Sequence, residues 1–334
     1  MDSKWIEELY GIQSERQFQL GGYNGLINKD KFYIVAPLKE SQEHLMEIKE
    51  IASHLVQSGD RHVLHLIQTK DGKLLSEIDG KSFCLLSGRF NEKQNNPALG
   101  RKLAKFHLRG LTIPFKVERT SRIGQWKKLW EKRLDQMESV WQGKVQQVPE
   151  NEFERLFIES FPYYMGLTEN AIQYLVDTEI DETPAQMDNG TVCHERFSKN
   201  SWGKDFVLKN PMDWVFDHRS RDLAEWTREE YFESKHVYHQ QVRRFFKDYQ
   251  AVSPLSAFAW RLLYARLLFP LHYFECIEGY YITNSEQEKK WLEERLAKHL
   301  QTSNEYEKFL GDFYQLAEVP LRKLKIPLLE WVTI

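Results

Sequence analysis

The sequence pattern of the chain changes at Gly88. Before this residue, short apolar runs are separated by glycines or charged turns, as expected of β-strands. After it, apolar residues recur with helical spacing over much longer segments, as expected of amphipathic helices. The change predicts an α+β chain with a β-rich part at residues 1–88 and a larger, mainly helical part at residues 89–334.

The predicted strands of the first part lie on either side of one helix. Strands are expected at residues 18–20, 25–28, 32–36, 62–69, 73–78 and 82–87. Asp71-Gly72 and Asp79-Gly80 separate the last three runs, and Asp-Gly tolerates the positive φ angles of tight hairpin turns. We therefore predict an antiparallel meander. The helix is expected around residues 45–55, with Gly59 at its end.

The second part is predicted to be helical except at residues 189–216. Helices are expected at residues 97–107, 123–140, 152–174 with a break or kink at Pro162, 227–249, 254–268, 285–300 and 303–316. Thr227-x-x-Glu230 and Ser285-x-x-Glu288 are typical of capping boxes at helix starts. Within residues 189–216, short extended runs at 191–193 and 206–208 flank a polar turn.

Composition does not favour nucleic acid or an acidic lipid surface as a partner, although a near-neutral charge excludes neither. Lys and Arg total 46 against 49 Asp and Glu, a net charge of -3, which gives no global attraction for nucleic acid. Charges interrupt the most apolar stretch, residues 262–281, so two buried helices are favoured over a transmembrane segment. Cys84, Cys193 and Cys276 are widely spaced, as expected of core thiols in a reducing compartment. The first residues lack the apolar run of a secretory signal, so synthesis in the cytoplasm is expected.

Four motifs in and around the polar interruption suggest chemistry. These are Leu103-Ala104-Lys105-Phe106-His107, Cys193-His194-Glu195-Arg196-Phe197, Asp213-Trp214 and Arg221-Asp222-Leu223-Ala224. They resemble the aminoglycoside and choline kinase branch of kinase-like phosphotransferases, in which a His-Gly-Asp loop has an Asn five residues beyond its Asp and a second Asp binds metal. Within that branch the chain is similar to the CotS family of bacterial endospore coat proteins, YutH type. That resemblance implies a bilobal, protein-kinase-like fold.

The resemblance also implies that the catalytic positions are altered. When His194 and Phe197 are aligned with the family loop, Arg196 replaces the catalytic aspartate and Ser201 replaces the magnesium-binding Asn. A guanidinium stays protonated and cannot accept a substrate proton. Ala36 occupies the position of the lysine in the first lobe. Catalysis is therefore expected to be lost.

Other positions are vestigial or open to two interpretations. Asp213 matches the metal-binding aspartate, and Arg196 is expected to pair with it. Gly21 and Gly22 resemble a nucleotide-covering loop, but a hairpin turn explains them equally well. Asp222 is interpreted as a cap at a helix start.

Two histidines are interpreted as structural, and a second register of the loop stays open. His194 is expected to brace the loop, and His107 to lie at a helix end, neither as a metal ligand. Glu195 and Asn200 are also five positions apart, so a slip by one residue would supply a carboxylate base and a metal ligand.

The resemblance implies a spore coat-associated protein with a degenerate kinase-like fold, a pseudokinase that acts as a binding or assembly component. It would be made in the mother-cell cytoplasm, move to the spore coat and bind other coat proteins, and no cofactor is expected. One alternative is an active kinase that uses ATP and Mg to phosphorylate a small-molecule hydroxyl. Another is a pseudokinase that senses nucleotide without turnover.

Overall fold

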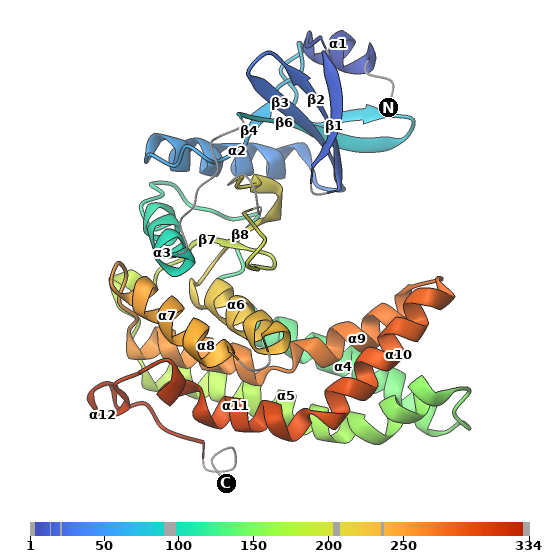
Figure 1. Cartoon of the computed structure of the whole chain (residues 1–334), viewed down its shortest axis with the longest axis vertical. Helices are drawn as coiled ribbons and strands as arrows, with labels where there is room; N and C mark the ends of the chain where they lie inside the picture. The colour runs from blue at the N-terminus through green and yellow to red at the C-terminus, as the bar shows by residue number, and fades with distance from the viewer. Residues whose placement is uncertain are drawn as a thin grey trace. The chain divides into compact units, whose positions relative to one another are not determined.

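The computed structural model of the chain describes residues 4–13, 15–20, 22–89, 98–202, 208–234 and 237–329 (Figure 1). Its contacts define two compact units. Unit 1 comprises residues 1–122, 189–222 and 248–253, and unit 2 comprises 123–188, 223–247 and 254–334. The polar motifs up to Asp222 therefore belong to the same unit as the β-rich part, and the lobe boundary at residue 88 stays a prediction.

Unit 1 contains a six-stranded antiparallel sheet. Its strands are β1 (Arg16–Leu20), β2 (Tyr23–Asn28), β3 (Lys31–Pro37), β4 (His65–Ile67), β5 (Ser76–Ile78) and β6 (Lys81–Arg89). They are ordered β1-β2-β3-β6-β4, and β5 also pairs with β6. The first three strands form the predicted meander. The predicted pairing of β5 with β6 is also confirmed, but the predicted pairing of β4 with β5 is wrong, because β4 pairs with β6.

The two Asp-Gly turns explain this difference. Asp79 and Gly80 have φ angles of 50° and 71° and form the tight β5–β6 hairpin as predicted. At Asp71-Gly72, the N–H of Thr69 donates to the carbonyl of Lys73, but no strand pairing continues from that turn. Turn chemistry therefore predicts a reversal of the chain but not the partner of each strand.

Helices cover both faces of this sheet (Figure 1). Helix α2 (Gln42–Gln57) begins at the Ser41 cap and is followed by Gly59, whose φ is +89°. It packs against alternate β3 residues Phe32, Ile34 and Ala36. Helix α1 (Lys4–Tyr10) packs against the opposite face, where Val35 points. The period-two alternation of β3 thus supplies two hydrophobic clusters.

The polar motifs lie on a small hairpin in unit 1. Strands β7 (Thr191–His194) and β8 (Trp214–Asp217) are antiparallel, and α3 (Leu99–Gly110) packs on β7. A Cβ atom at Gly110 would lie 2.2 Å from the hydroxyl of Thr191, so this close approach requires glycine. The strand predicted at 206–208 lies outside the described residues except for Leu208, and β8 is the partner of β7.

The remaining helices are α4 (Trp126–Val145), α5 (Glu152–Asp181), α6 (Ser220–Glu233), α7 (Tyr238–Gln250), α8 (Ala257–Leu268), α9 (Leu271–Ile282), α10 (Glu286–Gln301), α11 (Ser303–Leu316) and α12 (Leu321–Leu324). Within unit 2, α5 packs against α4, α8 and α10. The two helices predicted within residues 262–281 are confirmed as the end of α8 and most of α9. None of the helices in the described part of the chain has the length and apolar character needed to cross a bilayer.

Three helical predictions gave different outcomes. The capping box at Ser285 is confirmed in part, since its hydroxyl accepts from the N–H of Glu288. The prediction of a single helix at 227–249 is wrong, because α6 ends at Glu233 and α7 begins at Tyr238. Thr227 lies in the interior of α6 and is not a cap, since its hydroxyl donates to the Leu223 carbonyl. Pro162 does not break α5. The carbonyl of Ile158, which a proline at position 162 cannot bond, accepts from the indole N–H of Trp141 at 3.0 Å.

Candidate active site

The β7–β8 hairpin brings the loop motif and the candidate metal aspartate together. His194 pairs with Trp214, so the residues that follow β7 and precede β8 are neighbours. The N–H of Glu195 donates to the carbonyl of Asp213 at 2.7 Å. This is the arrangement that the resemblance predicts for a loop beside a metal-binding segment.

A fully buried carboxylate, Asp222, joins three elements of unit 1. One oxygen accepts from the backbone N–H of His194 at 2.8 Å. The other oxygen contacts Nδ1 of His194 at 2.7 Å and Nε2 of His107 at 3.2 Å. Trp202 donates to Nε2 of His194, and the hydroxyl of Tyr249 contacts Nδ1 of His107. Because the indole N–H can only donate, His194 carries its proton on Nδ1 when neutral.

The electrostatics of this network follow from its burial. Burial alone would raise the pKa of Asp222, but the two histidines lower it overall to well below its ordinary value. Burial also lowers the pKa of His107. His194 braces the loop as predicted. The prediction that Asp222 caps its own helix is wrong, because its donors come from β7 and α3. The sequence around the start of α6 contains no sign of these distant donors.

Arg221 is a loop-positioning residue that sequence reasoning missed. Its Nε donates to the carbonyl of His194 at 3.0 Å, and a terminal nitrogen donates to the carbonyl of Glu195 at 3.2 Å. The other terminal nitrogen pairs with the Asp217 carboxylate at 2.9 Å. The guanidinium therefore holds the loop backbone against β8. In the sequence, its place beside Asp222 in the Arg221-Asp222-Leu223-Ala224 motif is the one feature that could have pointed to this role.

The candidate catalytic side chains themselves face solvent. Glu195, Arg196 and Asn200 are exposed, whereas Phe197 is buried against His194 and lies in the core as expected. Arg196 donates to the carbonyl of Glu195 at 3.4 Å. Among the described residues, no ion pair joins Arg196 to Asp213, so the expected pairing is not formed between these side chains.

The pKa of Asp213 is raised above its ordinary value, mainly because the protein around it displaces water. The surrounding protein raises its pKa, His194 and Asn210 oppose the rise, and the negative charge of Glu195 adds to it. Because the side chain of Asp213 is itself exposed, solvent limits the size of this rise. Of these effects on the pKa, that of Glu195 is the smallest.

Ala36, at the predicted lysine position, is buried in an apolar cluster. It is 1% exposed and packs with the fully buried Cys84, against which Met212 also lies. The sulfur atoms of Cys84 and Met212 are 3.7 Å apart. Burial raises the pKa of Cys84 to about 12, so its thiol stays neutral. The described members of this cluster include no cationic side chain.

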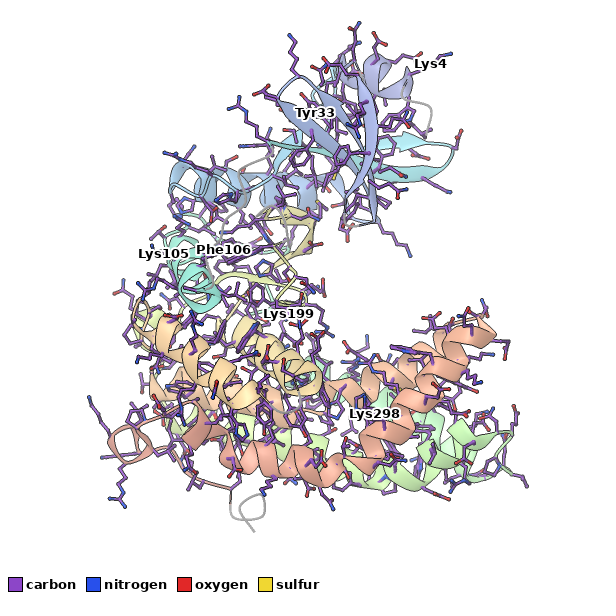
Figure 2. The ribbon with its side chains drawn as sticks, viewed as in Figure 1. Lys4, Tyr33, Lys105, Phe106, Lys199 and Lys298 are labelled. Atoms are coloured by element: carbon purple, nitrogen blue, oxygen red, sulfur yellow. The ribbon has the colours of Figure 1, made fainter. Side chains whose placement is uncertain are left out.

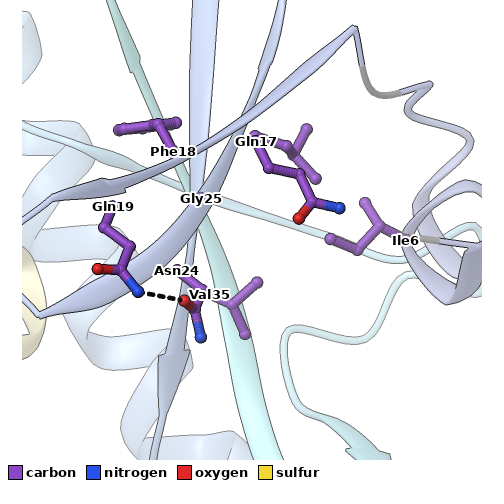
Figure 3. A pocket seen from close by; sticks show the side chains of 8 residues that line it. Ile6, Gln17, Phe18, Gln19, Asn24, Gly25 and Val35 are labelled. Carbon is purple, nitrogen blue, oxygen red and sulfur yellow. Dashed lines mark hydrogen bonds between the residues drawn. The ribbon is translucent and has the colours of Figure 1, made fainter. Parts of the chain in front are cut away.

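Gly22 belongs to a tight turn. Leu20 pairs with Tyr23, so β1 and β2 are joined by a two-residue hairpin turn, in which Gly22 has a φ of +83°. Gly21 lies outside the described residues. A pocket of about 500 Å³ is found nearby, lined by Ile6, Leu26 and Val35 (Figure 3). These three residues belong to the cluster on the α1 side of the sheet, whereas Phe18, which also lines the pocket, packs against Phe32 in the cluster of Ala36.

Glu47 on α2 is a second residue that sequence reasoning missed. Its carboxylate accepts the backbone N–H groups of Glu118, Arg119 and Thr120, at 2.7, 3.1 and 2.8 Å. Burial opposes its ionisation, but these donors lower its pKa overall. Among several acids on the helix, nothing in the sequence distinguishes it. It ties α2 to the segment that follows α3.

One cluster has the composition of a metal site. Ligand atoms of His107, Cys193 and Asp222 all lie within 4.8 Å of one another, and all three residues are buried. Both ring nitrogens of His107 and both oxygens of Asp222 already have hydrogen-bond partners. The cluster is therefore explained by the network around Asp222.

Comparison with known families agrees with this geometry. Residues 3–313 match the model of the family described as "Spore coat putative kinase YutH". The chain belongs to the YutH family. It is 42% identical over 330 residues to the endospore coat-associated protein YutH of Bacillus subtilis, covering 98% of this chain and 97% of that protein. Spore coat protein S of the same organism is 24% identical over 306 residues, covering 86% and 85%.

Solved structures establish the fold. The chain is similar to an aminoglycoside phosphotransferase from Alicyclobacillus acidocaldarius, with a TM-score of 0.67, 14% identity and coverage of 95% of this chain and 97% of that one. An AMP-bound spectinomycin phosphotransferase gives a TM-score of 0.60 at 13% identity, covering 95% and 97%. The predicted aminoglycoside phosphotransferase-like fold is confirmed, and identities this low carry no information on activity.

Proposed function

We propose that this chain is a spore coat-associated protein whose kinase-like fold serves as a binding or assembly component and no longer transfers phosphate. Membership of the YutH family supports the coat association. Other coat proteins are the proposed partners. The proposed path of the protein leads from the mother-cell cytoplasm to the spore coat.

The observation that carries the loss of chemistry is the environment of Ala36. In kinases a lysine on the corresponding strand contacts the nucleotide phosphates and pairs with a glutamate of the neighbouring helix. Here the position is enclosed by the apolar cluster of Cys84 and Met212. The α2 carboxylate of Glu47 bonds instead to the backbone of residues 118–120. Neither Ala36 nor Glu47 is thus available for an ion pair of that kind.

The loop supports the same proposal. Arg196, at the proposed position of the catalytic base, has no proton-accepting capacity at biological pH. Loss of a positioned base typically reduces the rate by about 10²- to 10⁴-fold. Asp213 is proposed as a vestigial metal position, without a resident ion, and no cofactor is required for the binding role.

Thermal unfolding with ATP and magnesium tests the proposal. A ligand at about a hundred times its Kd stabilises the native state by roughly 2.7 kcal/mol. We expect no magnesium-dependent rise in Tm up to millimolar ATP. A saturable, magnesium-dependent rise combined with ATP turnover on a panel of hydroxyl compounds would overturn the proposal. The same rise without turnover would identify the nucleotide-sensing pseudokinase.

A second candidate function, an active small-molecule hydroxyl kinase, is favoured by one observation. The backbone N–H of Glu195 donates to the backbone carbonyl of Asp213, which places these two residues beside each other. A base at Glu195 and metal ligands at Asp213 and Asn200 would then be required. This candidate predicts turnover that Glu195→Gln and Asp213→Asn each abolish, whereas Arg196→Ala leaves it intact. If Arg196→Asp alone created magnesium-dependent nucleotide binding, the register with Arg196 at the base position would be correct instead.

A further inference from the structure

A small basic pocket lies at the C-terminal end of α2 and along α3. It has a volume of about 210 Å³, and six of its lining residues carry basic side chains. These are Arg61, His62, Lys102, Lys105, Arg109 and Lys209. All belong to unit 1, and the exposed loop residues Glu195 and Arg196 do not line the pocket. The pocket therefore does not include these loop side chains, although its lining residue Trp202 also donates to His194 in the network around Asp222.

The positive charge of this pocket is not balanced by the protein. Its acidic lining residue, Asp60, is 2% exposed and already pairs with both Lys209 and Arg109. Lys102, Lys105 and Arg61 form no ion pair with any residue that the structure describes. Like charges held close together in a concave site repel one another unless an anion enters.

The floor of the pocket is held rigidly. Lys209 is 4% exposed, its N–H donates to the carbonyl of His62, and its carbonyl accepts from Leu64. Its ammonium lies 4.7 Å from the ring centre of Phe106 and 4.3 Å from that of Trp202. Burial, together with the charges of neighbouring cations, lowers the pKa of Lys209 to about 8 despite its contact with Asp60. The floor therefore needs no rearrangement before a ligand binds.

The wall of the pocket is one face of α3. Lys102, Lys105 and Arg109 are spaced so that they lie on the same side of the helix. Figure 2 labels Lys105, which is exposed, and its neighbour Phe106, which packs against the β7–β8 hairpin. Arg109 already bonds to Asp60 and to the carbonyls of residues 58 and 59. Direct contacts to a ligand are therefore left to the two lysines and Arg61.

We propose that this pocket binds a phosphate group, either as free phosphate or as part of a small phosphate monoester. Its volume is below the roughly 300–1,000 Å³ of pockets that enclose drug-sized ligands, so it suits a small anion better than a whole nucleotide. The ammonium groups of Lys102 and Lys105 supply charge-assisted donors, and Arg61 supplies a planar fork. Lys209 and Arg109 supply the positive field behind them. The proposal does not depend on the function proposed above.

The test is calorimetric titration of the intact chain with inorganic phosphate in a phosphate-free buffer. The test variant is Lys102→Ala/Lys105→Ala. Its control is Lys128→Ala/Lys132→Ala on α4, which removes the same charge from two other exposed lysines. We expect saturable binding that the test variant weakens about ten-fold or more and that the control retains. Lys105→Glu, at an exposed residue, is a second variant should the double variant unfold.

Two comparisons make the result decisive. Chloride at equal ionic strength measures general screening, and O-phosphoserine measures preference for an ester. Tighter binding of O-phosphoserine assigns the site to monoesters, and tighter binding of inorganic phosphate assigns it to the free ion. Equal phosphate affinity in the wild type and in both variants of the pocket would overturn the proposal. So would heats of phosphate titration no larger than those of chloride.

Discussion

Replacing Asp222 by Asn should destabilise the protein far more than its near-identical shape suggests. The carboxylate accepts three hydrogen bonds, two from His194 and one from His107. An amide offers one acceptor oxygen and one NH₂ donor, so in either orientation at least one buried N–H faces another donor. His194 cannot resolve the conflict by changing tautomer, because its Nε2 accepts from Trp202.

The magnitude follows from this count. One buried donor left without a partner costs about 1–3 kcal/mol, and the surviving bonds lose the strength that the negative charge gave them. We expect Asp222→Asn to lower the free energy of unfolding by about 3 kcal/mol and to reduce Tm by several degrees. The matched control is Asp135→Asn on an exposed face of α4, which should change stability by less than about 0.5 kcal/mol.

Thermal unfolding followed by circular dichroism provides the assay, with His107→Gln in the same background to test coupling. Coupled residues show non-additive effects, so the double variant should be more stable than the sum of the single effects predicts. If the free energy of unfolding of Asp222→Asn lay within about 0.5 kcal/mol of the wild-type value, the network would not hold the loop and this reasoning would be refuted.

Three further changes probe other parts of the fold. Arg221→Lys should destabilise by about 2–3 kcal/mol in urea unfolding, because one ammonium cannot reproduce three directed bonds; a neutral result would remove Arg221 from the loop clamp. Trp141→Phe keeps an aromatic ring but leaves the Ile158 carbonyl without the donor that Pro162 cannot supply, so a loss of about 1–2 kcal/mol is expected. Burial, followed by nearby positive charges, lowers the pKa of His299 to about 4. As pH drops from about 6.5 to 4, His299 binds a proton in the unfolded chain but not yet in the folded protein, so stability should fall over this range. His299→Gln should flatten the dependence of Tm on pH.

Local signals predicted the elements of this fold well. The helix face of Leu45 and Ile48, the Asp79-Gly80 hairpin and the cap at Ser285 depend on neighbours in the sequence, and all three appear in the structure. Thr227 shows the limit of such reasoning. Its spacing from Glu230 matches a capping box, but a threonine hydroxyl can equally bond to the carbonyl four residues before it within a helix.

Contacts between distant segments could not be predicted in this way. Pairing of β4 with β6 is decided by how the whole sheet buries its faces, not by the turn that follows β4. The donors to Asp222 come from residues 28 and 115 positions away. The sequence was interpreted as making Asp222 a helix cap, and only the assembled structure shows that it joins α3, β7 and α6.

The two altered catalytic positions differ in how easily they could be reversed. Arg196 is exposed, so Arg196→Asp should change the free energy of unfolding by less than about 1 kcal/mol. Ala36 is 1% exposed within an apolar cluster, and a buried ammonium there has no carboxylate partner among the described members of the cluster. Ala36→Lys should therefore cost several kcal/mol, or the new lysine should lose its proton.

Comparing Tm for the two variants measures this difference. Tyr33→Lys, at a half-buried residue on the other face of β3, serves as a control for a lysine in the same strand. If Ala36→Lys had the stability of the wild type, the cluster would have room for a lysine and the case against nucleotide binding would fail. If Ala36→Lys is strongly destabilised, restoring the loop with Arg196→Asp alone cannot restore a kinase. The lysine at position 36 would also be needed, and the packing of Cys84 and Met212 opposes it.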